Sequence, residues 1–300
     1  MKIFDRGDAK PVIEHFQASR RHVKLQRALK KCRNTLLVVL AIVLVPLVFM
    51  FTASFMESKE VLTMPYRWIP SSFHWENYVQ AIQGNDMKYF YARNILNSLI
   101  VAITVTLTNC VFAAMTGFGL AKYRFFGKRA VLILVMATMM IPFETIMIPL
   151  YMLVNNFGWQ DSYMGLIMPF LVNAFGIFMM RQFLLTFPED LLDAARIDGL
   201  NELSIFIRVV IPNSIPAMTA LGILTFRSQW DSMLWPLLVT QSEEMKTIPL
   251  YITKFTTEKY TNEGALLAAA VIASIPLFVV FFSLAKYFIQ GSSVFSGTKG

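Results

Sequence analysis

The sequence predicts an all-α integral membrane protein with six transmembrane helices and both termini on the cytoplasmic side. Three observations carry this prediction: the composition, six long apolar runs and the distribution of basic residues. Of the 300 residues, 56% are apolar and only 15% are charged, with 26 Phe and 18 Met. A soluble protein of this length could not bury so much apolar surface, so we expect the chain to lie in a membrane.

Six runs are long enough to cross about 30 Å of hydrocarbon, which takes about 20 residues at the helical rise. They cover residues 35–55, 94–121, 130–154, 163–185, 209–238 and 265–289. The fifth run is the weakest, because Pro212, Pro216, Arg227 and Asp231 interrupt it. Prolines are tolerated where neighbouring helices or waters satisfy the freed carbonyls, so we expect kinked helices that line a path.

The basic residues set the expected orientation. Of the 27 Lys and Arg, ten lie in residues 1–34, a basic tail before the first run. With this tail in the cytoplasm, 19 of the 27 fall on the inner side and seven on the outer side, with Arg227 inside a run. The loop 155–163 has no basic residue and falls outside. The positive-inside rule therefore predicts an N-in, C-in topology.

The first run, residues 35–55, is expected to be a retained anchor. It is too long and begins too late for a cleaved signal peptide, and no A-x-A-like site follows it. The tail pattern "HFQASRRHVKLQRALKKCR" predicts an amphipathic helix on the membrane surface. The aromatic-rich outer segment 56–92 fits either an amphipathic segment at the interface or a loop anchored by Trp and Tyr.

Little in the sequence favours catalysis, metal binding or nucleic-acid binding. Cys32 and Cys110 predict no disulfide framework, and the three histidines have no ligand spacing, so no metal site is expected. No H-E-x-x-H or G-x-S-G motif occurs in any run, so the chain is not expected to be an enzyme. A basic tail beside a membrane span contacts lipid headgroups, so the expected partner of the tail is membrane lipid and not nucleic acid.

A short charged stretch, "DAARIDG" at residues 193–199, lies on the predicted cytoplasmic side between the fourth and fifth runs. Gly199 suits a left-handed helix cap, and Asp193 can reach Arg196 three residues later. Asn201 is a good N-cap for a second helix that enters the membrane. The sequence therefore predicts a short helix, a turn and a further helix.

Two interpretations of this short helix stay open on physical grounds. It is either a connecting helix that lies on the inner surface or a docking knob for a partner. In the second case an exposed pair, Ala194 and Ala195, would let a partner's cleft close around the helix. Small side chains cover little apolar surface but allow another backbone to approach closely, which favours docking.

The charged stretch and the "VVIP" after it resemble the EAA loop of ABC-importer permeases. In that loop Glu-Ala-Ala, three residues, Gly, nine residues and Ile-x-Leu-Pro recur. The matching positions are Asp193, Ala194, Ala195, Gly199, Val209, Ile211 and Pro212. The segments "NSLIVA", "MMIPFETIMIPLY", "GIFMMRQFL", "MLWPL" and "GTKG" also resemble the maltose-type carbohydrate branch of this family, from about residue 90 to the end.

The resemblance implies the type I ABC importer permease fold. It places the permease domain at 90–290, a coupling helix at 188–200 and a cytoplasmic tail at 291–300, in which Lys299 and Gly300 match the family's ending. The residues implied to contact an ATPase are Asp193, Ala194, Ala195, Arg196, Asp198 and Gly199. The implied function is the permease subunit of an ATP-driven, binding-protein-dependent importer of a sugar or oligosaccharide in the bacterial inner membrane.

The resemblance also implies the partners. They are a second homologous permease, two ATPase subunits and an extracytoplasmic solute-binding protein. This chain has no G-x-x-x-x-G-K-[ST] phosphate loop, so it is expected to bind no cofactor, while the ATPases bind ATP and Mg. A secondary transporter is disfavoured, since neither an inverted repeat nor a relay of intramembrane carboxylates is visible.

The candidate residues of the solute path are Arg227, Gln229, Trp230, Asp231 and Glu144. A charge at a helix centre costs about 2.5–3.5 kcal/mol on insertion scales, so it usually faces a polar path or a partner. Arg227 and Asp231, four residues apart, either neutralise each other or line the path, and Glu144 is another candidate partner. Trp230 could stack on a sugar ring.

Two further points stay open. Trp235 fits either sugar stacking or anchoring at the membrane interface. The position of Arg227 points to an acidic or phosphorylated sugar, and the alternative is a permease for a non-sugar solute such as glycerol phosphate.

Overall fold

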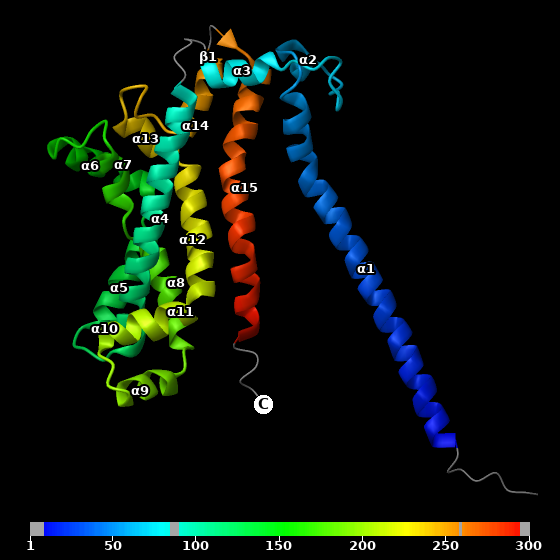
Figure 1. Ribbon diagram of the computed structural model, residues 1–300, viewed down its shortest axis with the longest axis vertical. Helices are drawn as coiled ribbons and strands as arrows, with labels where there is room; N and C mark the ends of the chain where they lie inside the picture. The colour runs from blue at the N-terminus through cyan, green and yellow to red at the C-terminus, as the bar shows by residue number, and fades with distance from the viewer. Residues whose placement is uncertain (1–8, 85–89, 258–259, 295–300) are drawn as a thin grey trace, which may run out of the picture.

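The computed structural model describes residues 9–84, 90–257 and 260–294, and it is built from helices (Figure 1). The elements are α1 Ala9–Ala53, α2 Ser58–Leu62, α3 Glu76–Gln83, α4 Phe90–Lys122, α5 Lys128–Met139, α6 Phe143–Asn156, α7 Tyr163–Ile167, η1 Met168–Phe170, α8 Ala174–Leu185, α9 Glu189–Ile197, α10 Glu202–Ile205, η2 Phe206–Val210, α11 Ile211–Asn213, α12 Ile215–Trp230, α13 Leu234–Val239, α14 Ile248–Ile252, η3 Thr253–Phe255, β1 Thr256–Thr257, β2 Tyr260–Thr261 and α15 Glu263–Val294. The antiparallel pair of β1 and β2 is the exception to the predicted all-α fold among these residues.

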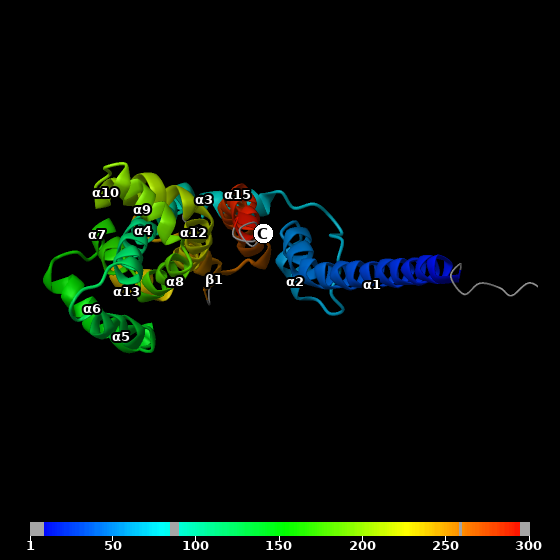
Figure 2. The same cartoon turned by 90° about the horizontal axis from the view of Figure 1, so that it is seen from below.

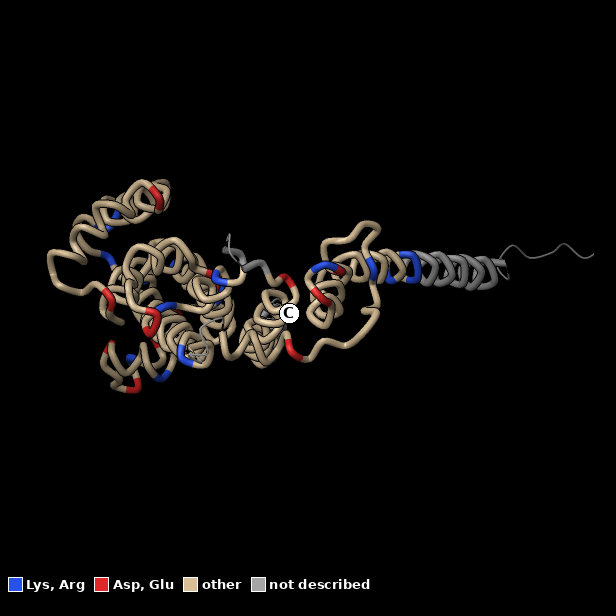
Figure 3. Tube along the Cα trace, turned by 90° about the horizontal axis from the view of Figure 1, so that it is seen from above, with Lys and Arg blue, Asp and Glu red and all other residues tan. Residues whose placement is uncertain are grey.

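The helices account for six crossings only when two bent pairs are counted. Among the described residues, four stretches are long and apolar enough to cross a membrane: Leu29–Ala53, Phe90–Lys122, Tyr163–Leu185 and Glu263–Tyr287. The other two candidates are α5 with α6, bent by 99°, and Glu202–Asn213 with α12, bent by 76°. Figure 3 shows how little of the described chain is charged.

The third and fifth spans, predicted over 130–154 and 209–238 as kinked helices, are each broken into two helices, so the interruption is sharper than a kink. α5 stops at Met139, and α6 starts directly after Pro142, which pushes the residue before it out of the helical region. With 12 residues, α5 reaches only about 18 Å, well short of the hydrocarbon thickness. The fifth span turns at Ser214, between α11 and α12.

α4 is the central helix of the bundle. It packs against α8 and α12, and α12 packs in turn against α15. A Cβ atom on Gly117 of α4 would lie 2.8 Å from the backbone nitrogen of Arg181 on α8, so only glycine allows this approach. We call the buried residues at the inner end of these helices the inner cluster: Cys110, Ala113, Ala114, Phe118, Leu120, Ile177, Met180, Leu184, Phe187, Leu192, Ala195, Ile205, Phe206, Val210, Ala217 and Leu221.

α1 stands apart from the bundle (Figures 1 and 2). It contacts α15, and only 6% of its most apolar window is buried within the chain. The helix runs unbroken from Ala9 to Ala53, since no Gly or Pro lies between Pro11 and Pro46. The helix predicted for the tail is thus present from Ala9 and continues into the first span without a break, and its place on the membrane surface stays a prediction. Residues 1–8, Lys299 and Gly300 lie outside the described residues.

Two short helices, α2 and α3, lie across the outer ends of the long helices (Figure 1). The buried Asn77 of α3 donates from Nδ2 to the carbonyls of Ser54, at 3.0 Å, and Met56, at 2.8 Å. Trp68 and Trp75 precede α3 in an irregular stretch and are at least half exposed. The outer segment thus combines two short helices with a loop that exposes aromatic side chains, and its place at the membrane interface stays a prediction.

Candidate functional site

The predicted short charged helix is α9, at the inner end of the molecule (Figure 1). Pro188 caps its start, and Gly199, with φ of +81°, follows its end in the left-handed region that suits glycine. The predicted pair forms, since Arg196 Nη1 donates to Asp193 Oδ1 at 2.8 Å. The predicted cap of the next helix is also present, because Asn201 Oδ1 accepts from the Ser204 backbone at 2.8 Å.

The two alanines of α9 do not share a face. Ala195 is only 6% exposed and belongs to the inner cluster, whereas Ala194 is exposed. Neighbouring residues on a helix point about 100° apart, so one alanine must turn inward when the other turns outward. The predicted exposed alanine pair is corrected to an outward row of Leu191, Ala194 and Ile197, of which Ile197 is 86% exposed.

Arg196 also links α9 to the helix that follows. Its Nε donates to Glu202 Oε1 of α10 at 3.0 Å, and the Tyr123 hydroxyl donates to the other oxygen of the same carboxylate. Burial, together with this hydrogen bond, raises the pKa of Tyr123 to about 12. Hydrogen bonds to Glu202 and Asp193 raise the pKa of Arg196. The link between α9, α10 and the end of α4 therefore keeps its protonation state across the physiological range.

The segment after α9 leads directly to α12, which together with its C-cap carries four of the five candidate residues of the solute path. It runs through α10, the π turn η2 and α11, and then bends by 76° at Ser214. Ile205, Phe206 and Val210 of this segment are buried in the inner cluster. The connection between α9 and α12 is thus packed into the inner cluster and is not a loose linker.

Arg227 and Asp231 form a neutral pair on an exposed part of α12. Arg227 Nε lies 3.4 Å from Asp231 Oδ2, and their side chains are 70% and 54% exposed. Gln229 between them is half-buried. Glu144 is exposed in the first turn of α6, and within the described ranges it forms no ion pair. The structure thus pairs Arg227 with Asp231 and leaves Glu144 out of that pair.

Both tryptophans of the fifth run are buried within the chain. Trp230 is 4% exposed, stacks on Phe226 and donates from Nε1 to the Ala273 carbonyl of α15 at 3.2 Å. Trp235 is 2% exposed and donates to the Gly165 carbonyl at 3.0 Å. In this conformation Trp235 is therefore available neither for sugar stacking nor for anchoring at the interface, and Trp230 packs α12 against α15.

Polar residues inside α4 hold neighbouring segments in place, and the sequence interpretation missed them. Asn97 Nδ2 donates to the carbonyls of Glu244, at 2.7 Å, and Lys246, at 2.9 Å, and its Oδ1 accepts from Tyr163. Ser98 accepts from the backbone of Ile248 at 2.8 Å. These side chains hold the outer loop between α13 and α14. The available signal was the occurrence of polar side chains within an otherwise apolar run.

Asn109, near the middle of α4, also holds neighbouring segments through its side-chain hydrogen bonds. Its Nδ2 donates to Thr225 of α12 at 2.9 Å, and its Oδ1 accepts from the Asn173 backbone, just before α8, at 3.1 Å. This buried amide joins three long helices. In a membrane such a contact has no competing water, so it fixes where the helices cross.

The outer loop carries a charged cluster, in which Glu243 forms ion pairs with Lys246 and Lys254. Burial would raise the pKa of Glu243, but hydrogen bonds from the two lysines outweigh it and hold this pKa below its usual range. Asp161, in the preceding outer loop, accepts from the backbones of Gln241, at 2.9 Å, and Ser242, at 3.0 Å. The outer loops are therefore tied together by charge-assisted contacts.

Residues 111–294 match the model of a family described as "binding-protein-dependent transport system inner membrane component". The chain belongs to this family. It is 37% identical over 231 residues to the arabinooligosaccharides transport system permease protein AraQ of Bacillus subtilis, covering 77% of this chain and 81% of that one. It is 30% identical to the sn-glycerol-3-phosphate transport system permease protein UgpE of Rhizobium meliloti, with coverages of 85% and 93%.

Two other comparisons point the same way. The lactose transport system permease protein LacG of Rhizobium radiobacter is 32% identical, over 65% of this chain and 71% of that one. A crystal structure of a bacterial ABC transporter involved in the import of the acidic polysaccharide alginate superposes with a TM-score of 0.72 at 22% identity, covering 96% of this chain and 100% of that one. The predicted fold class and family are thus confirmed.

This permease is therefore the membrane subunit of a binding-protein-dependent ABC importer, a multi-pass protein of the bacterial inner membrane. It is not itself an enzyme. The partner ATPase binds the ATP, and the partner outside the membrane is a solute-binding protein.

Proposed function

We propose that this permease imports a sugar or oligosaccharide and that α9 is the surface through which the ATPase drives it. In this proposal α12 lines half of the path, beside a second homologous permease, and two ATPase copies serve the pair. The observation that carries the proposal is the outward apolar row of α9, which is fixed through Arg196 to the segment that continues into α12.

The exposed face of α9 has the composition of a docking surface. Leu191, Ala194 and Ile197 form an apolar centre, and the exposed carboxylates of Asp193 and Asp198 border it. An apolar centre with a polar rim is typical of protein interfaces. A plain connecting helix gives no reason for Ile197 to stand 86% exposed on the aqueous side.

The link from α9 to α12 supplies a route for coupling. ATP shifts the conformation of the permease only if the ATPases bind it more tightly in one arrangement than in the other. The Asp193–Arg196–Glu202 contacts and the inner cluster let the difference reach α12 as a rigid displacement.

The path proposal rests on the exposed pair of α12. Arg227 and Asp231 together carry no net charge and offer donors and acceptors, which suits the hydroxyl groups of a sugar. The names of the relatives AraQ and LacG point to the same class of solute. A second candidate, glycerol phosphate, is favoured by the 70% exposure of Arg227, which a phosphate could draw away from Asp231.

Two experiments test the proposal. The first replaces Ile197 with Asp and measures how much ATPase co-purifies with the permease in mild detergent. We expect the ATPase to be lost, whereas Ile69→Asp, a site of similar exposure (78%) at the outer end, should retain it. Equal retention in both variants would contradict the role of α9.

The second experiment measures uptake into proteoliposomes that hold the whole importer, with its binding protein outside. The labelled solutes are an arabino-oligosaccharide, lactose and glycerol phosphate. Uptake of a sugar that depends on ATP supports the proposal. Uptake of glycerol phosphate alone would replace it with the second candidate, and Arg227→Met should then abolish that uptake.

A further inference from the structure

A cavity of about 480 Å³ opens at the inner end of the bundle, beside the turn between α4 and α5. It is lined by Phe125, Gly127, Lys128, Arg129, Leu132 and Arg181. The first five come from the turn and from α5, and the last comes from α8. In Figure 1 this end of α5 lies on the same side of the molecule as α9.

The charge of this cavity is uncompensated. Three of its lining residues are cations and none is an acid. None of these cations forms an ion pair with any residue that the structure describes, whereas nearby Lys122 lies 3.9 Å from Glu189. The Nε atom of Arg181 is shielded from solvent and, within the described ranges, has no hydrogen-bond partner. A shielded, charged donor without an acceptor is costly, so an anion at this place would be stabilising.

The start of α5 adds to the positive electrostatic potential of the cavity. Lys128 and Arg129 are the first two residues of this 12-residue helix, and its first turn has no acid. Cations oppose the positive end of the helix dipole, and a bound anion reverses that penalty. Lys128 is held in place because its Nζ donates to the carbonyls of Ala121, at 3.3 Å, and Tyr123, at 2.8 Å. An ammonium group has three donors, so one remains for a ligand.

The apolar surroundings point to a lipid rather than a free anion. Phe125 is 47% exposed, and Phe126 beside it is fully exposed, in the turn at the membrane end of α4. Phe side chains on such an exposed face insert at the boundary between headgroups and acyl chains. α5 has no fully buried residue, so the side that does not pack against α8 is free to contact acyl chains. A lipid whose headgroup contacts the cations and whose acyl chains lie along α5 would contact both the charged cavity and the apolar helix.

We propose that this cavity binds the phosphate of an anionic phospholipid from the inner leaflet, with its acyl chains along α5. Arg181 and Arg129 supply the charged donors for the phosphate oxygens. The site depends only on the placement of the chain in the membrane, so it stands independently of the transported solute.

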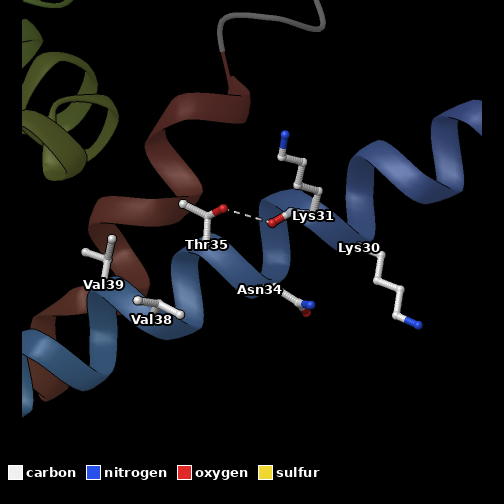
Figure 4. A pocket seen from close by; sticks show the side chains of 6 residues that line it. All are labelled: Lys30, Lys31, Asn34, Thr35, Val38 and Val39. Atoms are coloured by element: carbon white, nitrogen blue, oxygen red, sulfur yellow. Dashed lines mark hydrogen bonds between the residues drawn. The ribbon is translucent and has the colours of Figure 1, made fainter.

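A second basic surface, on α1, provides a comparison. A hollow of about 540 Å³ there is lined by Lys30, Lys31, Asn34, Thr35, Val38 and Val39. Figure 4 shows Lys30 and Lys31 pointing in different directions, so they do not converge on one ligand. This surface has the same kind of charge at the inner side without a shaped site, which makes it a suitable control.

The test uses the intact importer in detergent, titrated with short-chain phosphatidylglycerol and followed by native mass spectrometry. The variant Arg129→Gln with Arg181→Gln removes two cations from the cavity. Lys30→Gln with Lys31→Gln removes two from α1. Since a cation near an anionic lipid is worth about fivefold in affinity, we expect the first variant to bind roughly 25-fold more weakly and the control to change far less. Arg181→Lys, which keeps the charge but not the planar fork, should lose only part of the affinity.

Three outcomes would overturn the proposal. Equal losses in the cavity and α1 variants would mean that only diffuse surface charge attracts the lipid. Equal binding of phosphatidylcholine of the same chain length would remove the role of the anionic headgroup. Displacement of phosphatidylglycerol by millimolar inorganic phosphate, lost in the cavity variant, would identify a free phosphate as the ligand.

Discussion

Replacing Asn97 with Leu should destabilise the permease by about 3 kcal/mol. The side chain is fully buried in α4 and takes part in three hydrogen bonds, with lengths of 2.7, 2.9 and 2.7 Å, to Glu244, Lys246 and Tyr163. Each bond contributes about 1 kcal/mol net, and leaving a buried partner unsatisfied raises the cost further. Leu has a similar volume, so no large cavity adds to the loss.

The assay is reversible denaturant unfolding of the purified chain in detergent micelles. Tyr163→Phe alone should cost about 1 kcal/mol, and it should cost almost nothing once Asn97 is already Leu, because the shared hydrogen bond is gone. Asn213→Leu is the matched control. Its amide is exposed and bonds only within its own helix region, to the Val209 carbonyl at 2.8 Å, so its cost should stay within about 0.5 kcal/mol. Equal costs for the two asparagines would refute the anchoring role of Asn97.

Three further changes test the inner link, the end of α9 and the outer loop. Arg196→Met removes two partly exposed ion pairs worth about 0.2–1 kcal/mol each, so it should lower stability by about 1 kcal/mol. The stimulation of ATP hydrolysis by the binding protein should fall several-fold, and unchanged stimulation would exclude a coupling role. Gly199→Ala should cost about 1–2 kcal/mol in thermal unfolding, because φ is +81° there while the surrounding space is open. The lowered pKa of Glu243 means that its contribution is complete above the ordinary carboxyl value of 4.5 and is lost as the pH falls through the lower folded value. Glu243→Gln should therefore reduce the loss of unfolding free energy between about pH 5 and pH 2. An unchanged pH dependence in this range would contradict this assignment.

The spans and the short charged helix could be predicted because they depend on local pattern. Runs of about 20 apolar residues have few other solutions, and the caps of α9 and α10 are set by Gly199 and Asn201 themselves. The pair of Arg196 with Asp193 follows from helical spacing alone. The breaks in the third and fifth spans were harder to predict, because proline inside a membrane helix permits a mild kink as readily as a bend of 99° or 76°.

The orientation of side chains in the bundle could not be predicted in the same way. Lipid is as apolar as a protein core, so hydropathy does not separate a residue that faces lipid from one that faces another helix. Trp230 and Trp235 illustrate this limit, because each looked available and each is buried with its indole N–H bound to a carbonyl. Ala194 and Ala195 illustrate it on the aqueous side, since only the position of the inner cluster decides which of them turns inward.

The polar residues of α4 constrain how this chain can move. Asn97 holds the outer loop, Asn109 holds α12 and the start of α8, and Gly117 lets α8 pack tightly at the inner end. α4 is fixed to its neighbours at these three levels. A displacement of α9 can therefore move the permease in two ways. Either the whole bundle rotates as one body, or the bend at Ser214 changes its angle.

These two modes make different demands on the contact between Asn109 and Thr225. Rotation as one body leaves their 2.9 Å hydrogen bond intact, whereas a change at the bend tilts α12 against α4 and strains it. Thr225→Val would therefore leave ATP-driven uptake unchanged under the first mode and would alter it under the second. Because α12 is also tied to α15 through Trp230, and the segment before the bend is buried in the inner cluster, we expect rotation as one body and unchanged uptake.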